Sequence, residues 1–162
     1  MWFDVEAVPL SFTERSPFHI ETVARIEATP ARVFEIFATG EGQTEWFQDW
    51  VGFDWTTKAP HGVGSERVVN LKMLSVKERF LAWDPGKRLS FTIYGITLPL
   101  VKVMVEDMTL TPDGEGATRF TWRVHYHPTL LMRMVHPIGR AIFSKMFRAS
   151  ADGLARYAKA HA

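Results

Sequence analysis

The sequence predicts an α+β protein in which a curved antiparallel sheet of about seven strands carries two short helices and one long C-terminal helix. Two observations predict this class. Residues 18–128 consist mainly of short segments in which apolar and polar residues alternate, with turn residues between them. Residues 129–162 are the only stretch long enough for a major helix. Because a long amphipathic helix needs an apolar surface to cover, we expect it to pack across the sheet.

The N-terminal part is predicted to contain a lead-in, an edge strand and two short helices. Residues 1–17 carry two prolines and show no clear period, so we expect an extended lead-in, and we expect residues 18–162 to form a single domain. Residues 18–27 alternate and predict a strand. A Thr-Pro helix start and a terminal glycine predict a helix over residues 29–40, and residues 41–47 predict a second one. Together these two helices can close one end of the sheet.

Six further strands are predicted by alternation. They cover, in order, residues 51–55, 67–73, 75–83, 89–93, 100–111 and 120–126. The turns between them hold the residues that tight turns need. Pro85-Gly86 suits the two central positions of a type II turn, and Pro112-Asp113-Gly114 turns the longest strand back. The sheet is therefore expected to be antiparallel throughout.

The C-terminal helix is predicted to be amphipathic with a broad apolar face. At 100° per residue its central apolar stripe contains Ile138, Ile142, Met146, Ala149, Gly153 and Tyr157. Four residues widen this stripe on one side: Phe143, Phe147, Ser150 and Leu154. Five basic residues occupy the opposite arc: Arg140, Lys145, Arg148, Arg156 and Lys159. The apolar face is wide enough to be buried, and the basic face is expected to be solvated.

Pro137 interrupts the start of this helix because proline cannot donate a backbone hydrogen bond and its ring crowds the preceding turn. One interpretation is a kink or a short separate helix before it. The other is a mobile lip over a pocket. Leu130 and Met134 fall on the polar arc if the helix runs straight, so an unkinked helix would expose apolar side chains at its first turn.

Composition excludes several classes of protein. The net charge is +1, which gives no electrostatic argument for nucleic acid as a partner. The chain has no cysteine, which removes disulfides, thiolate nucleophiles and thiolate metal sites. No apolar run approaches the roughly 20 residues of a membrane span, and the acidic N-terminus does not resemble a signal peptide. We expect a cytoplasmic monomer or homodimer with no stable membrane insertion.

Charged residues at inward-facing strand positions are the main candidates for chemistry. Alternation directs Arg67 and Glu106 into the apolar face, where a charge is costly unless it is paired. They can form a structural ion pair, anchor a polar ligand group, or act as an acid–base pair. Glu78 is a third candidate, but its strand has two plausible inward faces, one with Glu78 and Phe80 and the other with Leu81 and Trp83.

Histidines and tyrosines give weaker signals. His125 and His127 could form a metal pair, but they lie on the face opposite Trp122 and no third ligand is close in sequence, so we predict no metal site. His136 is expected to be a surface residue. Tyr94 and Tyr126 could donate to a ligand oxygen, but half-buried rings with solvated hydroxyls are the simpler interpretation.

Known catalytic and cofactor motifs are absent. The Gly62-Val63-Gly64 string lacks the third glycine and the following helix of a dinucleotide-binding loop, so it predicts a turn. The chain contains no GxSxG, no P-loop and no HExxH sequence. We therefore predict no cofactor, and the sequence leans away from an enzyme.

Three strings carry a resemblance to a known family: RIEATPARVFEIF (25–37), VKERFLAWDPGKRLSFTI (76–93) and GATRFTWRVHY (116–126). They resemble the helix-grip superfamily of START, Bet v 1-like and polyketide cyclase/dehydrase proteins, most of all its small bacterial polyketide cyclase-like members. The likeness extends over nearly the whole chain. The resemblance implies a cavity between the sheet and the long helix that binds a lipid, sterol, quinone or polyketide. Some members of the superfamily catalyse cyclisation or dehydration in this cavity.

The predicted function is the binding of a small hydrophobic or amphipathic molecule, with a cyclase or dehydratase and a protein-interaction module as alternatives. The catalytic candidates are Glu106 and Arg67. The predicted ligand-binding residues combine these two with apolar side chains that either line a cavity or fill the core. They are Trp46, Phe53, Trp55, Arg67, Leu71, Phe91, Ile93, Met104, Glu106, Met108, Trp122, Tyr126, Met134, Ile138 and Ile142.

Overall fold

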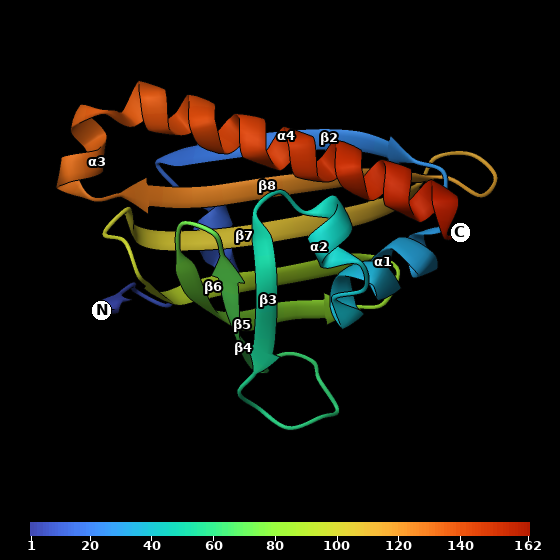
Figure 1. Ribbon diagram of the computed structural model, residues 1–162, viewed down its shortest axis with the longest axis horizontal. Coiled ribbons are helices and arrows are strands. Elements are labelled where there is room, and N and C mark those ends of the chain that lie inside the picture. Colours follow the sequence, from blue (N-terminus) through green and yellow to red (C-terminus); the bar gives the residue numbers. More distant parts are fainter.

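The computed structural model describes residues 1–162 and confirms the predicted α+β class. Seven strands form one antiparallel sheet in the order β2-β8-β7-β6-β5-β4-β3 (Figure 1). Their bounds are β2 Phe18–Ile26, β3 Trp50–Trp55, β4 Glu66–Leu71, β5 Ser75–Asp84, β6 Arg88–Ile96, β7 Val101–Pro112 and β8 Thr118–Pro128. A two-residue strand, β1 (Phe3–Asp4), adds to β6.

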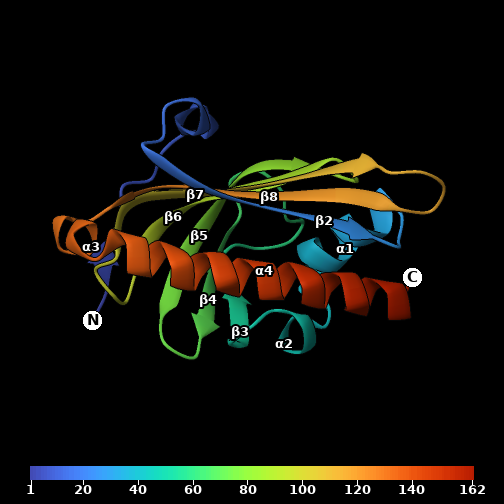
Figure 2. The same cartoon turned by 90° about the horizontal axis from the view of Figure 1, so that it is seen from above.

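Four α-helices accompany the sheet: α1 (Pro30–Thr39), α2 (Gln43–Trp46), α3 (Leu130–Met134) and α4 (His136–Ala160). Helix α4 lies lengthwise across one face of the sheet, beside β2 and β8 (Figure 2). Helices α1 and α2 lie near the C-terminal end of α4, whereas α3 lies at its other end (Figure 1). Two helices thus lie at one end of α4, and one short helix lies at the other.

Local sequence signals for α1 and the β5–β6 turn act as predicted. The Thr29 side chain accepts a hydrogen bond from the Arg32 amide (3.2 Å), and Pro30 is the first helical residue. Gly40 ends the helix in the left-handed conformation (φ 73°). Gly86 has φ 72°, which the third position of a type II turn requires. These signals fix where the chain leaves the sheet and returns to it.

The N-terminal residues cover the face of the sheet opposite α4. Residues Leu10–Glu14 form a 3-10 helix, η1, which lies on that side of the sheet in Figure 2. Val8 and Phe12 are buried there against Val103 and Val105 of β7. The central strands are therefore covered on both faces, which explains why β6 is buried along most of its length.

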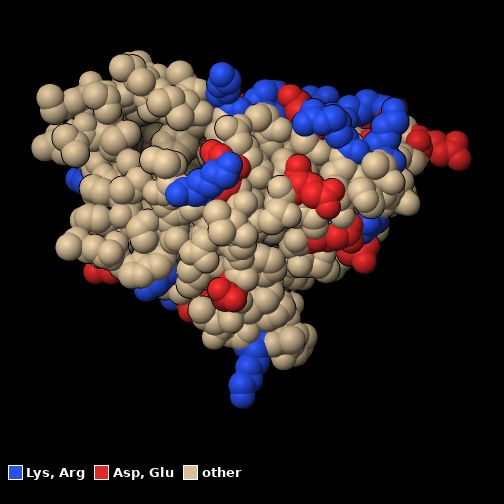
Figure 3. Space-filling model, viewed as in Figure 1, with Lys and Arg blue, Asp and Glu red and all other residues tan.

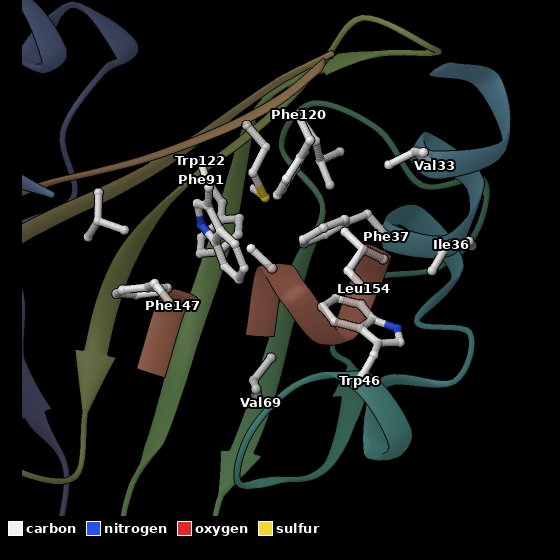
Figure 4. Close-up of a cluster of buried hydrophobic side chains, with 14 of the residues drawn as sticks. Val33, Ile36, Phe37, Trp46, Val69, Phe91, Phe120, Trp122, Phe147 and Leu154 are labelled. Carbon is white, nitrogen blue, oxygen red and sulfur yellow. The ribbon is translucent and has the colours of Figure 1, made fainter. Parts of the chain in front are cut away.

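A cluster of buried hydrophobic side chains connects the C-terminal half of α4 with the sheet and with the helices α1 and α2 (Figure 4). The Trp122 ring packs against Phe147 of α4 and Phe37 of α1, with ring centroids 5.0 and 5.5 Å apart. Gly153 allows a close helix contact, because a Cβ atom at this position would lie 2.3 Å from the carbonyl oxygen of Trp46. This end of the molecule is tightly closed.

The C-terminal segment corrects one prediction and confirms another. A break at Val135 separates α3 from α4, as the interpretation of a short separate helix before Pro137 predicts. The predicted apolar stripe is wrong in its centre. The buried side of α4 contains Phe147, Ser150, Ala151, Gly153, Leu154 and Ala158. Ile138, Ile142 and Ala149 of the predicted stripe are exposed. The helix is rotated toward Phe147 and Leu154, which pack in the buried cluster, where the Phe147 ring contacts Trp122.

Candidate functional site

A cavity of about 450 Å³ lies between the concave face of the sheet and the N-terminal half of α4. Of its 35 lining residues 24 are hydrophobic, so its walls favour an apolar occupant. The sheet contributes residues from all seven main strands, and α3 and α4 contribute the opposite wall. The cavity thus occupies the half of the molecule that α1 and α2 do not fill.

Nine of the fifteen residues predicted for the site line this cavity. They are Arg67, Leu71, Phe91, Ile93, Met104, Glu106, Trp122, Tyr126 and Ile142. All but the last are on strands, where alternation gives each side chain a definite face. The structure therefore brings the two charged candidates and most of the strand candidates together at one place.

Four of the other predicted residues belong to the core instead of the cavity wall. Trp46 is buried against Phe37, and its indole nitrogen donates to the Glu41 carbonyl (2.9 Å). Met108 is buried deeper in the core. Phe53 and Trp55 lie behind the cavity wall, where their rings contact the Arg67 guanidinium. The type of a residue and the face of the sheet on which it lies do not by themselves show whether it belongs to the core or lines the cavity.

Met134 and Ile138, by contrast, point to solvent. Their exposed fractions are 81% and 65%. Met134 is on the short helix α3, and Ile138 is on the first turn of α4, beyond the part of the helix that touches the aromatic core. The break at Val135 and the rotation of α4 account for both positions.

A buried ion pair forms the polar end of the cavity. Arg67 Nε donates to Glu78 Oε2 at 2.6 Å, and both side chains are almost fully buried. Directly opposed positions on β4 and β5 bring the two residues together. Burial raises the pKa of Glu78, and the Arg67 guanidinium opposes this shift. The second nitrogen of the guanidinium, Nη1, is buried without a hydrogen-bond partner.

Aromatic rings surround the Arg67 guanidinium. Its central carbon lies 5.1–5.9 Å from five ring centroids, which belong to Trp50, Phe53, Trp55, Phe80 and Phe91. Ring faces attract a cation, and they also fix its position by packing. The rings therefore fix the position of the guanidinium of Arg67, a residue that lines the cavity.

Glu106 provides a second polar group at this end. Its Oε2 atom accepts a hydrogen bond from the Trp122 indole nitrogen at 2.9 Å. Burial raises the pKa of Glu106 to about 8, and the nearby Glu78 carboxylate acts in the same direction. At neutral pH the Glu106 carboxyl is therefore mainly protonated, and it can donate a hydrogen bond as well as accept one.

His136 and Tyr126 form a third polar feature of the cavity. The Tyr126 hydroxyl and His136 Nε2 are 2.7 Å apart, and both residues line the cavity. The Phe18 ring covers the imidazole at a centroid distance of 4.3 Å. The prediction of a surface histidine is therefore wrong, and so is the prediction of a solvated Tyr126 hydroxyl. The fold of α3 returns His136 to the end of β8, which no pattern in the sequence indicates.

The remaining histidine candidates lie on the other face of the sheet. His125 Nδ1 is 2.7 Å from the Ser16 hydroxyl, under the N-terminal segment. Burial lowers the pKa of His125. No group of three or more His, Asp or Glu side chains is arranged to hold a metal ion. No helix combines the length and hydropathy that crossing a membrane requires.

Sequence reasoning missed several lining residues. Phe47 and Trp50 stand at the end of α2 and the start of β3, where no alternation is established. Val69 lies on the same face of β4 as Arg67 and could have been included for that reason. Met132 of α3 and Phe143 of α4 line the opposite wall. The positions of Met132 and Phe143 depend on the relative orientation of α3 and α4, which the break at Val135 sets.

Comparisons with known proteins agree with this architecture. Residues 17–159 match the family model described as "Polyketide cyclase / dehydrase and lipid transport". An uncharacterized protein of Mycobacterium tuberculosis (strain ATCC 25618 / H37Rv) is 28% identical over 142 residues, which are 87% of this chain and 81% of the relative.

Two solved structures illustrate the likeness of fold. One is the Zhui aromatase/cyclase from Streptomyces sp. R1128, with TM-score 0.74 and 13% identity over 88% of this chain and 93% of that one. The other is norcoclaurine synthase from Thalictrum flavum, with TM-score 0.64 and 14% identity over 86% of this chain and 85% of that one. The fold is the predicted helix-grip fold, and the chain belongs to the polyketide cyclase/dehydrase and lipid transport family.

Proposed function

We propose that this protein binds a small hydrophobic or amphipathic molecule in the cavity between the sheet and α4. The observation that carries the proposal is the cavity itself, which measures about 450 Å³ and has mainly apolar walls. Pockets for small ligands in proteins typically have volumes of about 300–1,000 Å³. A cavity of this size is costly in a protein that has no use for it, because its lining loses contacts that a filled core would make.

The polar end of the cavity defines what kind of molecule fits. Arg67 Nη1 is a buried donor without a partner, and the protonated Glu106 carboxyl can donate or accept. A ligand oxygen placed between these groups would satisfy the free donor. We therefore propose an apolar ligand that carries a carbonyl, hydroxyl or phenol group at one end, and not a plain hydrocarbon.

Binding can be tested with a fluorescent apolar probe, Nile red, and its displacement by fatty acids, sterols, quinones and polyphenols. Met104 lines the cavity and is only half-buried, so Met104→Trp should fill part of the cavity without disturbing the aromatic core. We expect this variant to bind the probe at least tenfold more weakly than the unmodified protein. Val63→Trp, at an exposed loop position, is the matched control and should bind normally. Equal binding by Met104→Trp would refute the cavity as the binding site.

A second candidate function is the catalysis of a cyclisation or dehydration, and Glu106 is the observation that favours it. A carboxyl with a pKa of about 8 is a proton donor at neutral pH, and Glu106 lines a cavity with mainly apolar walls. Two proteins of similar fold are an aromatase/cyclase and norcoclaurine synthase. Glu106 would protonate a substrate oxygen, and Arg67 would hold that oxygen in position.

The two functions differ in the effect of Glu106→Gln. An amide keeps the size and most of the hydrogen bonding of the carboxyl but cannot supply a proton. If the protein is an enzyme, the variant should lose turnover of an aromatic polyketide-type substrate by about 10²-fold or more while the substrate affinity changes little. Unchanged turnover would exclude this role for Glu106. We do not propose a pure protein-interaction module, because such a module does not require the cavity.

A further inference from the structure

Large apolar side chains are exposed side by side at the end of the molecule where α3 meets α4. They are Leu130, Leu131, Met134, Val135, Ile138 and Ile142. Leu130 and Met134 have exposed fractions of 73% and 81%. Figure 3 shows the corresponding surface as a continuous area without charged side chains, which is hollowed beside the start of α4. We call these six residues the apolar rim. A contiguous exposed apolar area of this kind indicates contact with another apolar surface.

The apolar rim adjoins the mouth of the cavity. Ile142 belongs to the rim and also lines the cavity. Met73, after β4, and Leu98, after β6, are exposed lining residues from the opposite side of the opening. Met132, between the rim residues of α3, lines the cavity as well. A partner that covers the rim would therefore cover the mouth.

The charged side chains on α3 and on the first half of α4 are all positive, and Asp49, which lines the cavity from the opposite side, is paired with Lys72 (3.6 Å). No aspartate or glutamate occurs between Glu115 and Asp152. Arg133, Arg140 and Lys145 lie in this interval and take part in no ion pair. Lys145 follows Ile138 and Ile142 at helical spacing, so it extends the same stripe of α4 and does not lie on the opposite arc that the sequence predicted for it. A surface with apolar residues and unpaired basic residues suits the interface of a membrane that contains anionic lipid.

We propose that the apolar rim and these three basic residues dock the protein onto an anionic membrane surface, with the mouth of the cavity facing the lipid. A second copy of the chain fits the surface less well. In a symmetric dimer the rim would face itself, and Arg133, Arg140 and Lys145 would meet like charges. Anionic lipid headgroups would supply the negative charge that residues 116–151 lack. Together with the proposed ligand binding, docking would let an apolar molecule pass between lipid and cavity without crossing water.

Docking can be tested by co-sedimentation of the full-length protein with vesicles, in the absence of any added ligand. Vesicles of phosphatidylcholine alone are compared with vesicles of phosphatidylcholine and phosphatidylglycerol. We expect binding to the mixed vesicles and weak binding to the neutral ones. Lys145→Glu should weaken binding by at least about fivefold, since each basic residue near such a surface contributes about that factor. Met134→Asp should weaken it by about tenfold or more, because a charge replaces an apolar side chain that would be buried.

Two controls make the result specific. Val63→Asp places the same charge at another highly exposed apolar position, in the loop between β3 and β4, and Arg119→Glu reverses a basic residue at the far end of β8. Both should bind as the unmodified protein does. Equal binding to neutral and anionic vesicles, or no binding to either, would overturn the proposal. The proposal would also be overturned if the unmodified protein formed a dimer that Met134→Asp dissociates and if it did not bind vesicles. Because no ligand is present, failure here leaves the ligand-binding proposal standing.

Discussion

The two halves of α4 belong to one continuous helix but have different surroundings. From Phe147 to Ala158 the helix buries one residue on almost every turn against the sheet, α1 and α2. From His136 to Met146 it buries none completely. The first half instead covers the cavity and presents Ile138 and Ile142 to solvent. We call these the closed half and the open half.

The difference comes from the elements that pack against each half of α4, and not from the sequence of the helix itself. Both halves contain large apolar residues, but only the closed half meets a second layer of helix. There the Ser150 hydroxyl accepts a hydrogen bond from the backbone N–H of Gln48 (3.1 Å), and Gly153 lets the backbone of α2 approach α4 closely. In the open half the facing strands carry Arg67, Glu78 and Glu106, whose ionic and polar groups cannot be packed like a core. The same fold thus holds a rigid core and a cavity at opposite ends of one helix.

The largest expected effect separates the two halves by stability. Leu154→Ala removes a side chain with no exposed surface from the closed half, and it should lower the free energy of unfolding by about 2–5 kcal/mol. Ile142→Ala in the open half should change it by about 0.5 kcal/mol or less. Urea denaturation of both variants provides the measurement. Similar losses in the two variants would show that the open half is packed as tightly as the closed half.

The pH dependence of stability should reveal the buried carboxyl of the open half. The pKa of Glu106 is raised from 4.5 in the unfolded chain to about 8 in the folded protein. The folded state therefore binds the proton more tightly, so this contribution to stability is complete below pH 4.5 and is lost as the pH rises to about 8. The slope is at most about 1.4 kcal/mol per pH unit.

Glu106→Gln provides the control for this prediction. The amide does not titrate, so urea denaturation of the variant should show a smaller fall in stability across the same interval. If the two proteins gave parallel curves, Glu106 would not be held in its acid form.

Two glycines of α4 provide a smaller and sharper comparison. Gly153→Ala should lower the free energy of unfolding by about 1–3 kcal/mol, because the new Cβ atom would lie 2.3 Å from the Trp46 carbonyl oxygen. At Gly139 in the open half a Cβ atom would meet only the end of the Met132 side chain, at 3.2 Å. Gly139→Ala should therefore be neutral or stabilise by up to about 1 kcal/mol, since alanine favours a helix. Thermal unfolding measures the stability of both variants. A larger loss of stability in Gly139→Ala than in Gly153→Ala would contradict the description of the two halves as closed and open.

Local signals in the sequence predicted most of the fold. The Thr29-Pro30 helix start, the Pro85-Gly86 turn and the alternation along the strands act through neighbouring residues, so they can be recognised without knowledge of tertiary structure. Alternation also placed Arg67 and Glu106 on one face of the sheet, where the structure has them.

What the sequence did not reveal depends on contacts between distant residues. Arg67 pairs with Glu78 because β4 and β5 are in a register that the turn between them sets. Of the two inward faces that seemed equally plausible for β5, the one with Glu78 and Phe80 is buried, whereas Leu81 of the other packs on the opposite side of the sheet. The register of β5 shifts after Phe80, and the rings of Phe80 and Trp83 pack together at 4.9 Å. An irregularity of this kind breaks the simple alternation on which the prediction rested.

Ligand binding in the cavity can be tested by native mass spectrometry of the purified protein, followed by denaturing extraction of any bound molecule. We expect the unmodified protein and Val63→Trp to retain an apolar molecule with an oxygen-containing end, or to take one up from a mixture of fatty acids, sterols, quinones and polyphenols. Met104→Trp, with its cavity partly filled, should do so far less. Equal occupancy in all three proteins, or none in any of them, would contradict a binding function for the cavity.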